Sequence, residues 1–200
     1  KMNIIPFNEK YFPQAIQLVE NHWRKEYDGQ SETLKHIVFE FVARKNYYKS
    51  AYDLMIIEGD ILRGILFGYS KEMQNDAREW LDSQLSKLNE KEQSIVNTLA
   101  NYLFRFDDLM DTYLTDNDRK VALIISNIQG GGTALLNEFT ENAKADFKEN
   151  IVLWTDSTCN HSYYPKRGFE LFFTDISKLE QSQDDTIETM FYKKKIESDK

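Results

Sequence analysis

Residues 121–139 read VALIISNIQGGGTALLNEF and predict a strand, a glycine turn and a helix in succession. The apolar, largely β-branched run at 121–125 is typical of a buried strand, and apolar residues recur at helical spacing from Ala134 to Phe139. The three glycines between them permit positive φ and a close approach of main-chain N–H groups to a ligand. A helix start adds unpaired N–H donors and a partial positive charge. The stretch is therefore suited to binding phosphate.

Two common phosphate-binding motifs do not fit these glycines. Walker A requires a lysine followed by serine or threonine after its last glycine, whereas Gly132 is followed by Thr133 and Ala134. A dinucleotide fingerprint requires G-x-G-x-x-G, and here the third glycine is misplaced. The spacing disfavours a nucleotide triphosphatase and a dinucleotide-binding protein.

Length and composition exclude several classes of protein. At 200 residues with 41% hydrophobic and 14% aromatic content, the chain can bury one sizeable core, and we expect one domain over 1–200. The net charge of -8 argues against nucleic acid as a partner, because that affinity comes from clustered Lys and Arg. No apolar run approaches the roughly 18–20 residues of a membrane helix, and the N-terminus lacks a signal-peptide apolar segment, so we expect a cytoplasmic protein. With one cysteine and no metal-ligand spacing among the histidines, we expect no metal site.

Cap and turn residues divide the chain into interleaved strands and helices. The expected elements are an edge strand at 2–6, helices after Asn8 and Ser31, a β-hairpin at 54–67 turning at 58–60, a helical hairpin within 71–118, the strand–glycine–helix unit, a strand at 150–154, a short helix within 160–167, and strands at 169–173 and 186–194. The charges of TDNDRK at 115–120 are expected in a solvated turn, and SKLEQSQDD at 177–185 in a loop. This order predicts an α/β protein with a mixed sheet.

Three stretches resemble the GNAT superfamily of N-acetyltransferases. Residues 127–132, NIQGGG, resemble its acetyl-coenzyme A loop, Q/R-x-x-G-x-G/A, with Asn127 in place of the usual Gln or Arg. Residues 163–169, YYPKRGF, resemble its Y-x-x-x-G-F segment, and residues 58–65, EGDILRGI, resemble its central hairpin. All three occur in the family's order. The resemblance covers nearly the whole chain except 71–118, where the usual connection is short.

The resemblance implies a partly splayed sheet that holds acetyl-coenzyme A, as cosubstrate, between strands ending near Ser126 and Trp154. It further implies acetyl transfer to the primary amine of a small molecule or protein, with Tyr164 matching the tyrosine that often protonates the departing thiolate. Asn160 also suits a helix cap, which is the simpler interpretation. The implied cosubstrate-binding residues are Ile125, Ser126, Asn127, Gln129, Gly130, Gly131, Gly132, Thr133, Ala134 and Asn160.

Five other side chains near these motifs are weaker candidates. Asp156 and Glu58 are carboxylates that could take a proton from the amine, although both suit solvated positions. Cys159 lacks an evident base to activate it as a nucleophile. His22 lies where the family's first helices border the acceptor cleft, but it also suits a surface or core position. Tyr163 is expected to pack.

The sequence does not determine the role of the insertion or the identity of the acceptor substrate. Residues 71–118 could cover the acceptor side, or pack on the sheet or on a second subunit of a homodimer. The alternatives to an enzyme are a non-catalytic GNAT-like module that binds acyl-coenzyme A or a protein, and an unrelated phosphate-ligand-binding protein. Aminoglycoside, polyamine, amino acid and protein N-terminus all remain possible acceptors.

Overall fold

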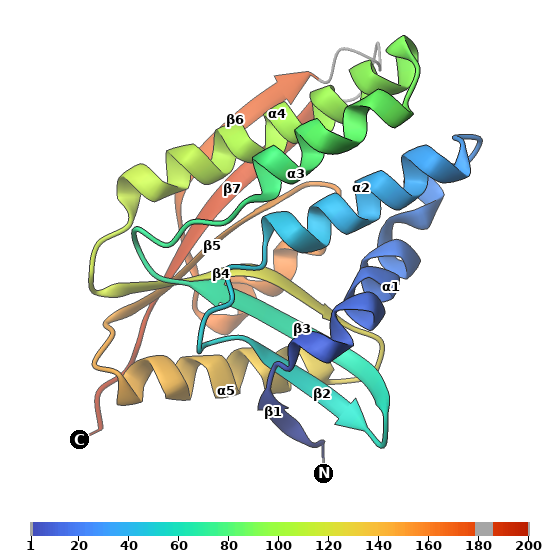
Figure 1. The fold of residues 1–200 in the computed structure, drawn as a ribbon. Coiled ribbons are helices and arrows are strands. Elements are labelled where there is room, and N and C mark those ends of the chain that lie inside the picture. The colour runs from blue at the N-terminus through green and yellow to red at the C-terminus, as the bar shows by residue number, and fades with distance from the viewer. Residues whose placement is uncertain (1, 179–185, 200) are drawn as a thin grey trace.

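The computed structural model describes residues 2–178 and 186–199, whose seven strands form one sheet in the order β1-β2-β3-β4-β5-β7-β6 (Figure 1). Neighbouring strands are antiparallel, except for the parallel pair β4 and β5. The sheet is therefore mixed, as predicted. The strands are β1 Ile4–Pro6, β2 Leu54–Glu58, β3 Ile61–Tyr69, β4 Asp118–Ser126, β5 Asn150–Asp156, β6 Glu170–Lys178 and β7 Thr186–Lys195.

Ser31 and Asn89 cap α-helices as the sequence predicts, whereas Asn8 caps only the 3₁₀ turn Glu9–Tyr11 that precedes the first α-helix. Ser31 accepts a hydrogen bond from the Leu34 N–H at the start of the second helix, and Asn89 and Glu92 form a reciprocal capping box at the start of the fourth. No helix in the described part of the chain is both long and apolar enough to cross a membrane. The helices are α1 Phe12–Trp23, α2 Glu32–Lys45, α3 Ala77–Gln84, α4 Glu90–Tyr113 and α5 Gly131–Ala145.

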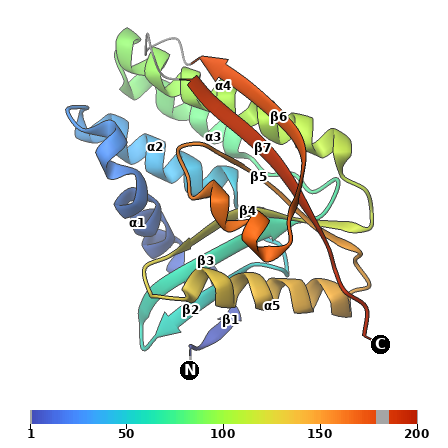
Figure 2. The ribbon, with the colours of Figure 1, turned by 180° about the vertical axis from the view of Figure 1, so that it is seen from behind.

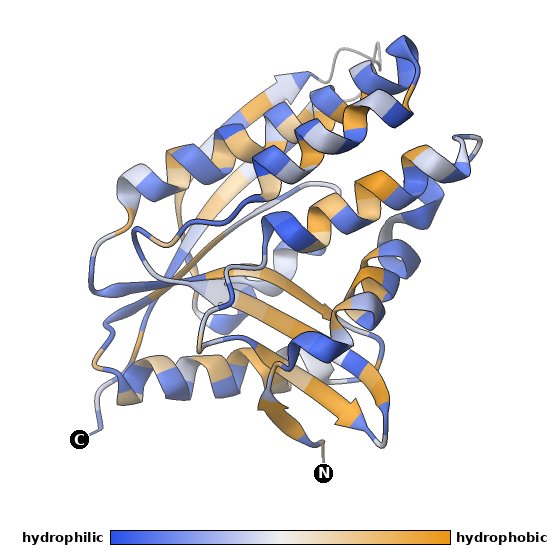
Figure 3. Cartoon of the chain, in the orientation of Figure 1, coloured by the Kyte–Doolittle hydropathy of each residue, from blue (hydrophilic) through white to orange (hydrophobic). Residues whose placement is uncertain are grey.

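Alternating side chains of the central strands supply two separate core clusters. Met55 and Ile57 pack toward α1 and α2 on one face, whereas Leu54 and Ile56 pack toward α5 on the other. The apolar residues gather in these central strands, as Figure 3 shows, and the view from behind in Figure 2 places α5 on the face away from α1 and α2. The sheet is thus covered on both faces.

The predicted helical hairpin packs along the C-terminal strands as part of the core. A third cluster joins residues of α4, including Phe106 and Met110, to Val152 of β5 and Phe191 of β7. In Figure 1, α4 runs along β6 and β7, whereas α3 lies against α2. Residues 71–118 are therefore built into the fold and not attached to its surface.

The prediction of a solvated turn over 115–120 is wrong for residues 118–120. β4 begins at Asp118, and Asp118, Arg119 and Lys120 are each only 1% exposed. Local composition indicated a turn, but partners from distant elements compensate these charges. Asp118 accepts hydrogen bonds from the Thr115 N–H and the Asn150 amide, and Arg119 pairs with Asp146 at 3.0 Å.

Lys120 belongs to a buried cluster of charges that connects five elements. The Asp107 carboxylate on α4 accepts from Lys120 Nζ at 2.9 Å, Lys45 Nζ of α2 at 2.6 Å and Trp154 Nε1 of β5 at 2.8 Å. Lys120 Nζ also donates to the Tyr69 hydroxyl of β3 at 2.8 Å. Burial alone would raise the pKa of Asp107, but the two ammonium groups outweigh it and hold that pKa below its ordinary value.

Two further boundaries differ from the sequence prediction. The helix predicted within 160–167 consists of two short 3₁₀ turns, His161–Tyr163 and Pro165–Arg167, because Pro165 cannot continue the N–H ladder of an α-helix. β6 continues to Lys178 instead of ending at Phe173, since it stays paired with β7. The loop predicted at 177–185 therefore begins later, and 179–185 lie outside the described residues.

We predict that Asp107→Asn destabilises the fold strongly while Asp108→Asn, one residue along α4, does not. Losing the first carboxylate leaves two buried ammonium groups without the carboxylate that they contact directly and should lower the free energy of unfolding by about 3–5 kcal/mol. Asp108 pairs with Arg78 at the surface, where its side chain is 67% exposed, so its loss should cost less than about 1 kcal/mol. Urea unfolding of both variants measures this difference. Equal losses would contradict the role given to the cluster.

Candidate functional site

β4 and β5 diverge after a short parallel pairing. Their register contains three pairs, of which Lys120 opposite Val152 is the last. Beyond it, β4 stays paired with β3 as far as Ser126, and β5 stays paired with β7 as far as Asp156. Each strand therefore keeps one unpaired edge, and the two edges face a gap that widens toward their C-terminal ends.

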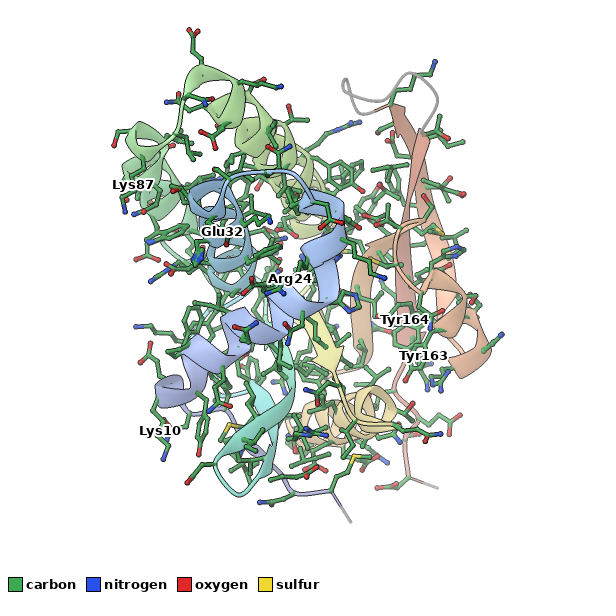
Figure 4. The ribbon with its side chains drawn as sticks, turned by 90° about the vertical axis from the view of Figure 1, so that its right-hand side faces the viewer. Lys10, Arg24, Glu32, Lys87, Tyr163 and Tyr164 are labelled. Carbon is green, nitrogen blue, oxygen red and sulfur yellow. The ribbon has the colours of Figure 1, made fainter. Side chains whose placement is uncertain are left out.

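A cavity of about 610 Å³ occupies this gap and extends beneath the helices. Its walls come from α1, α2, α4, the diverging strands, the segment after β5 and Gly132 of α5. Figure 4 shows Tyr163 and Tyr164 on the segment after β5, with Arg24 marking the end of α1. The volume lies within the range of small-molecule and cofactor sites.

Each of the three glycines at the start of α5 lies in a different structural environment. Gly130 has a φ of 75°, in the left-handed region that favours glycine. A Cβ on Gly131 would lie 2.0 Å from Ser126 Oγ, so the close contact between strand and helix excludes a side chain there. A Cβ on Gly132 would meet no atom within 4 Å. Gly132 thus lines open space in the cavity, where a ligand can approach the main chain.

Main-chain donors remain available at the same point. The N–H groups of Gly131 and Ala134 donate to Ile128 and Gly130 carbonyls at 3.0 Å. Among the described residues, those of Gly132 and Thr133 have no backbone acceptor, as expected for the first turn of a helix. Together with the helix dipole, these donors form a site for an anion.

Tyr163 hydrogen-bonds to the first turn of α5 instead of only packing, which corrects the sequence prediction. Its hydroxyl lies 2.7 Å from Thr133 Oγ1. Arg167 donates to the same oxygen at 3.1 Å, and its guanidinium carbon lies 3.4 Å from the centre of the Tyr163 ring. A cation therefore lies beside the anion site. Sequence reasoning missed Arg167, although its position within YYPKRGF was a signal.

Tyr164 lines the cavity with a hydroxyl that makes no hydrogen bond to any described residue. Its ring packs edge-on against Phe169, at 5.6 Å between ring centres. Burial is the main cause that raises the pKa of the Tyr164 hydroxyl above its ordinary value. The group is therefore protonated at neutral pH and has a donor free for a ligand in the gap.

Neither a family model nor a curated protein matches this sequence, but solved structures match its fold. Over 100% of this chain and 97% of that one, it is similar to the ribosomal-protein-S18-alanine N-acetyltransferase from Escherichia coli, with a TM-score of 0.54 and 9% identity. An acetyltransferase of the GNAT family from Staphylococcus aureus Mu50 matches with a TM-score of 0.54 and 14% identity, over 98% of this chain and 100% of that one. An agmatine N-acetyltransferase matches with a TM-score of 0.58 and 7% identity, over 97% of this chain and 99% of that one.

The chain has the GNAT fold. The alignments cover 97% to 100% of these three proteins and at least 97% of this chain. At such low identity the likeness concerns the fold alone.

Asp156 at the end of β5 is buried and hydrogen-bonded within this GNAT fold, contrary to the expectation of a solvated side chain. It is 8% exposed, and it accepts from the Tyr102 hydroxyl at 3.0 Å and from the Thr158 N–H at 2.9 Å. Tyr102 comes from α4, and its hydroxyl also lies 2.9 Å from Thr189 Oγ1. The sequence showed Tyr102 only as one member of an apolar helical stripe.

Glu26 is the second carboxylate that lines the cavity, and the sequence gave no sign of it. It lies in the 3₁₀ turn Arg24–Tyr27, just after α1. Partial burial and then the charge of Asp156 raise the pKa of Glu26. Glu26 and Asp156 thus line the same cavity, and each carries a carboxyl group.

The remaining weaker candidates divide between the cavity and the surface. His22 and Cys159 line the cavity, whereas Glu58 lies at the hairpin turn 3.5 Å from Arg63 and does not. Burial and then Asp156 raise the pKa of the Cys159 thiol to about 11, which keeps it protonated and poorly nucleophilic. Asn160 also lines the cavity, but its side chain caps no helix N–H. The capping interpretation of Asn160 is therefore wrong.

The structure brings together only part of the cosubstrate-binding set that the resemblance implies. Ser126, Gly132 and Asn160 line the cavity, but Ile125 packs in the core between sheet and helices. Asn127, Gln129 and Gly130 are exposed at the turn, and Gly131 is buried against Ser126. Thr133 and Ala134 follow in the first turn of α5, where Thr133 holds Tyr163.

We predict opposite effects of alanine at the two adjacent helix glycines. Gly131→Ala forces a methyl group onto Ser126 and should lower the free energy of unfolding by about 1–3 kcal/mol. Gly132→Ala meets open space and should leave stability unchanged or raise it by up to about 1 kcal/mol. Urea denaturation measures both values. A similar loss in the two variants would mean that Gly132 does not face open space.

Proposed function

We propose that this protein is an acetyl-coenzyme A-dependent N-acetyltransferase that acts by direct transfer to a primary amine. The observation that carries the proposal is the open space at Gly132, where unpaired N–H donors of α5 meet the gap between β4 and β5. Among the similar structures, one is named for agmatine and another for the alanine of a ribosomal protein, both as N-acetyltransferases. These names support acetylation of an amine and leave the acceptor open.

Two sets of groups in the site fit two parts of the cosubstrate, its pyrophosphate and its thioester arm. The N–H groups of Gly132 and Thr133, with the cation of Arg167 beside them, suit the pyrophosphate. The unpaired edges of β4 and β5 suit the amide-bearing thioester arm, which can form strand-like hydrogen bonds. Asn127 takes no part in this assignment, because its side chain lies outside the cavity. Arg167 would supply the charge that the motif's first position lacks.

Transfer forms one bond and breaks another. The neutral amine attacks the thioester carbonyl, a C–N bond forms, the C–S bond breaks and the thiolate leaves. Tyr164 would donate its proton to that thiolate, and the excess proton of the amine would pass to a carboxylate. Asp156 and Glu26, both in the cavity wall, are the candidates to accept it directly or through water.

We predict that acetyl-coenzyme A binds the protein and that Gly132→Val weakens this binding at least about tenfold. The valine side chain would occupy the space where the pyrophosphate approaches α5. Glu138→Val places the same side chain on an exposed position of α5 and should leave the affinity unchanged. Isothermal titration gives the dissociation constants. No binding at millimolar acetyl-coenzyme A would rule out the enzyme and also a non-catalytic acyl-coenzyme A-binding module.

We predict that Tyr164→Phe lowers kcat about 10²-fold with little change in acetyl-coenzyme A affinity. The substitution removes the donor for the departing thiolate and retains the ring that packs on Phe169. Tyr113→Phe on α4 is the matched control, since Tyr113 is 43% exposed and lies outside the cavity. Release of free thiol reports turnover. Unchanged turnover in the Tyr164 variant would remove Tyr164 from the reaction.

A further inference from the structure

The cavity has a side that the thioester arm does not need. That side lies under α1, α2 and α4, and it meets the gap where β5 ends at Asp156. Its wall is mainly apolar, and the insertion supplies much of it through one face of α4. The apolar side chains are Trp23, Tyr27, Val42, Ile95, Leu99 and Leu103.

Negative charge is concentrated at one place on this wall. Glu26 and Asp156 both face the cavity, and the effect of Asp156 on the pKa of Glu26 indicates that the two interact. A single ammonium group between them can therefore be attracted by both carboxylates.

The one Lys or Arg among the described cavity-lining residues is already paired. Lys45 is buried, and its Nζ donates to Asp107 at 2.6 Å. It is thus not free to bind the carboxylate of an amino acid acceptor. The other polar side chains on this side include His22, Gln30 and Thr98, but no described cavity-lining residue supplies a third carboxylate for the second ammonium of a polyamine.

We propose that the acceptor is a primary amine on an apolar body, received with its ammonium end beside Glu26 and Asp156 and its body against α4. This inference rests on the proposed function, because it assigns the second substrate of the same site. A linear alkylamine or an arylalkylamine fits it, since each has one charge and an apolar remainder.

A homologous series of amines tests whether the acceptor is a primary amine on an apolar body. From butylamine to hexylamine, kcat/KM should rise about fourfold per methylene, because each methylene is buried against the wall. Putrescine, which is butylamine with a second ammonium group, should be at least about tenfold poorer than butylamine, because that charge would be desolvated. A flat series, or putrescine as good as butylamine, would overturn the inference.

Alanine substitutions of two leucines on α4 test whether this helix contacts the apolar body of the amine. Leu99 lines the cavity, so Leu99→Ala should lower kcat/KM for hexylamine about fivefold to tenfold and leave acetyl-coenzyme A affinity unchanged. Leu109 is also partly buried, but it packs in the cluster around Phe106 and Phe191, away from the cavity. Leu109→Ala should leave the selectivity for hexylamine over butylamine as it is. Equal effects of the two variants would show that α4 does not form the acceptor wall.

Titration of the amines into the full chain saturated with coenzyme A separates this inference from the proposed function. Tighter binding of hexylamine than of putrescine, weakened by Leu99→Ala, supports the acceptor class even if no amine is acetylated. In that case the proposed catalysis alone fails. Turnover of putrescine or an amino acid in preference to every alkylamine would instead support catalysis and contradict the acceptor class.

Discussion

The rest of the structure depends on the buried carboxylate of Asp107 and the three groups that donate to it. Lys120 contributes the last residue of β4 that is paired with β5, and Trp154 lies two residues beyond the last paired residue of β5. Asp107 therefore holds both strands at the point where they separate, while Lys45 holds α2 to the same point. Two lysines and one aspartate leave a positive excess, which Asp111 reduces through its hydrogen bond from Tyr69. A charge cluster of this kind costs much to bury, so its value lies in fixing one geometry.

That geometry explains why the helical insertion belongs to the site. In a parallel pair, nothing in the hydrogen-bond pattern requires the strands to diverge after three residues. Here the Trp154 side chain turns to Asp107 of α4, and Tyr102 of the same helix donates to Asp156 at the end of β5. α4 thus contacts β5 at the start and at the end of its free edge. The helix is therefore tied by hydrogen bonds to the β5 side of the gap.

The sequence was sufficient for the order of strands and helices because these signals are local, whereas the splay between β4 and β5 was expected only from the family resemblance. Alternating apolar strands, the caps at Ser31 and Asn89 and the turn at residues 58–60 each specify an element without long-range information. The sequence did not predict the burial of Asp118, Arg119 and Lys120. Their partners lie far away in the chain, as for Tyr69, which is 51 positions from Lys120. The same limit hid Glu26, which reaches the cavity only after folding, and Arg167, which then donates to Thr133 in the first turn of α5. Motif reading found the glycine turn and Tyr164, but it did not separate Gly131, which is packed, from Gly132, which is open.

The spacing along α4 allows the acceptor wall to change without disturbing the cluster. Leu99, Leu103 and Asp107 follow one another at intervals of four residues and so share one face of the helix. The first two line the cavity and the third holds the strands apart, about two helical turns from Leu99. Substitutions more than about 7–10 Å apart without shared partners have nearly additive effects. A change of residue at Ile95 or Leu99 can therefore alter the space for an acceptor while Asp107 keeps the cosubstrate gap unchanged.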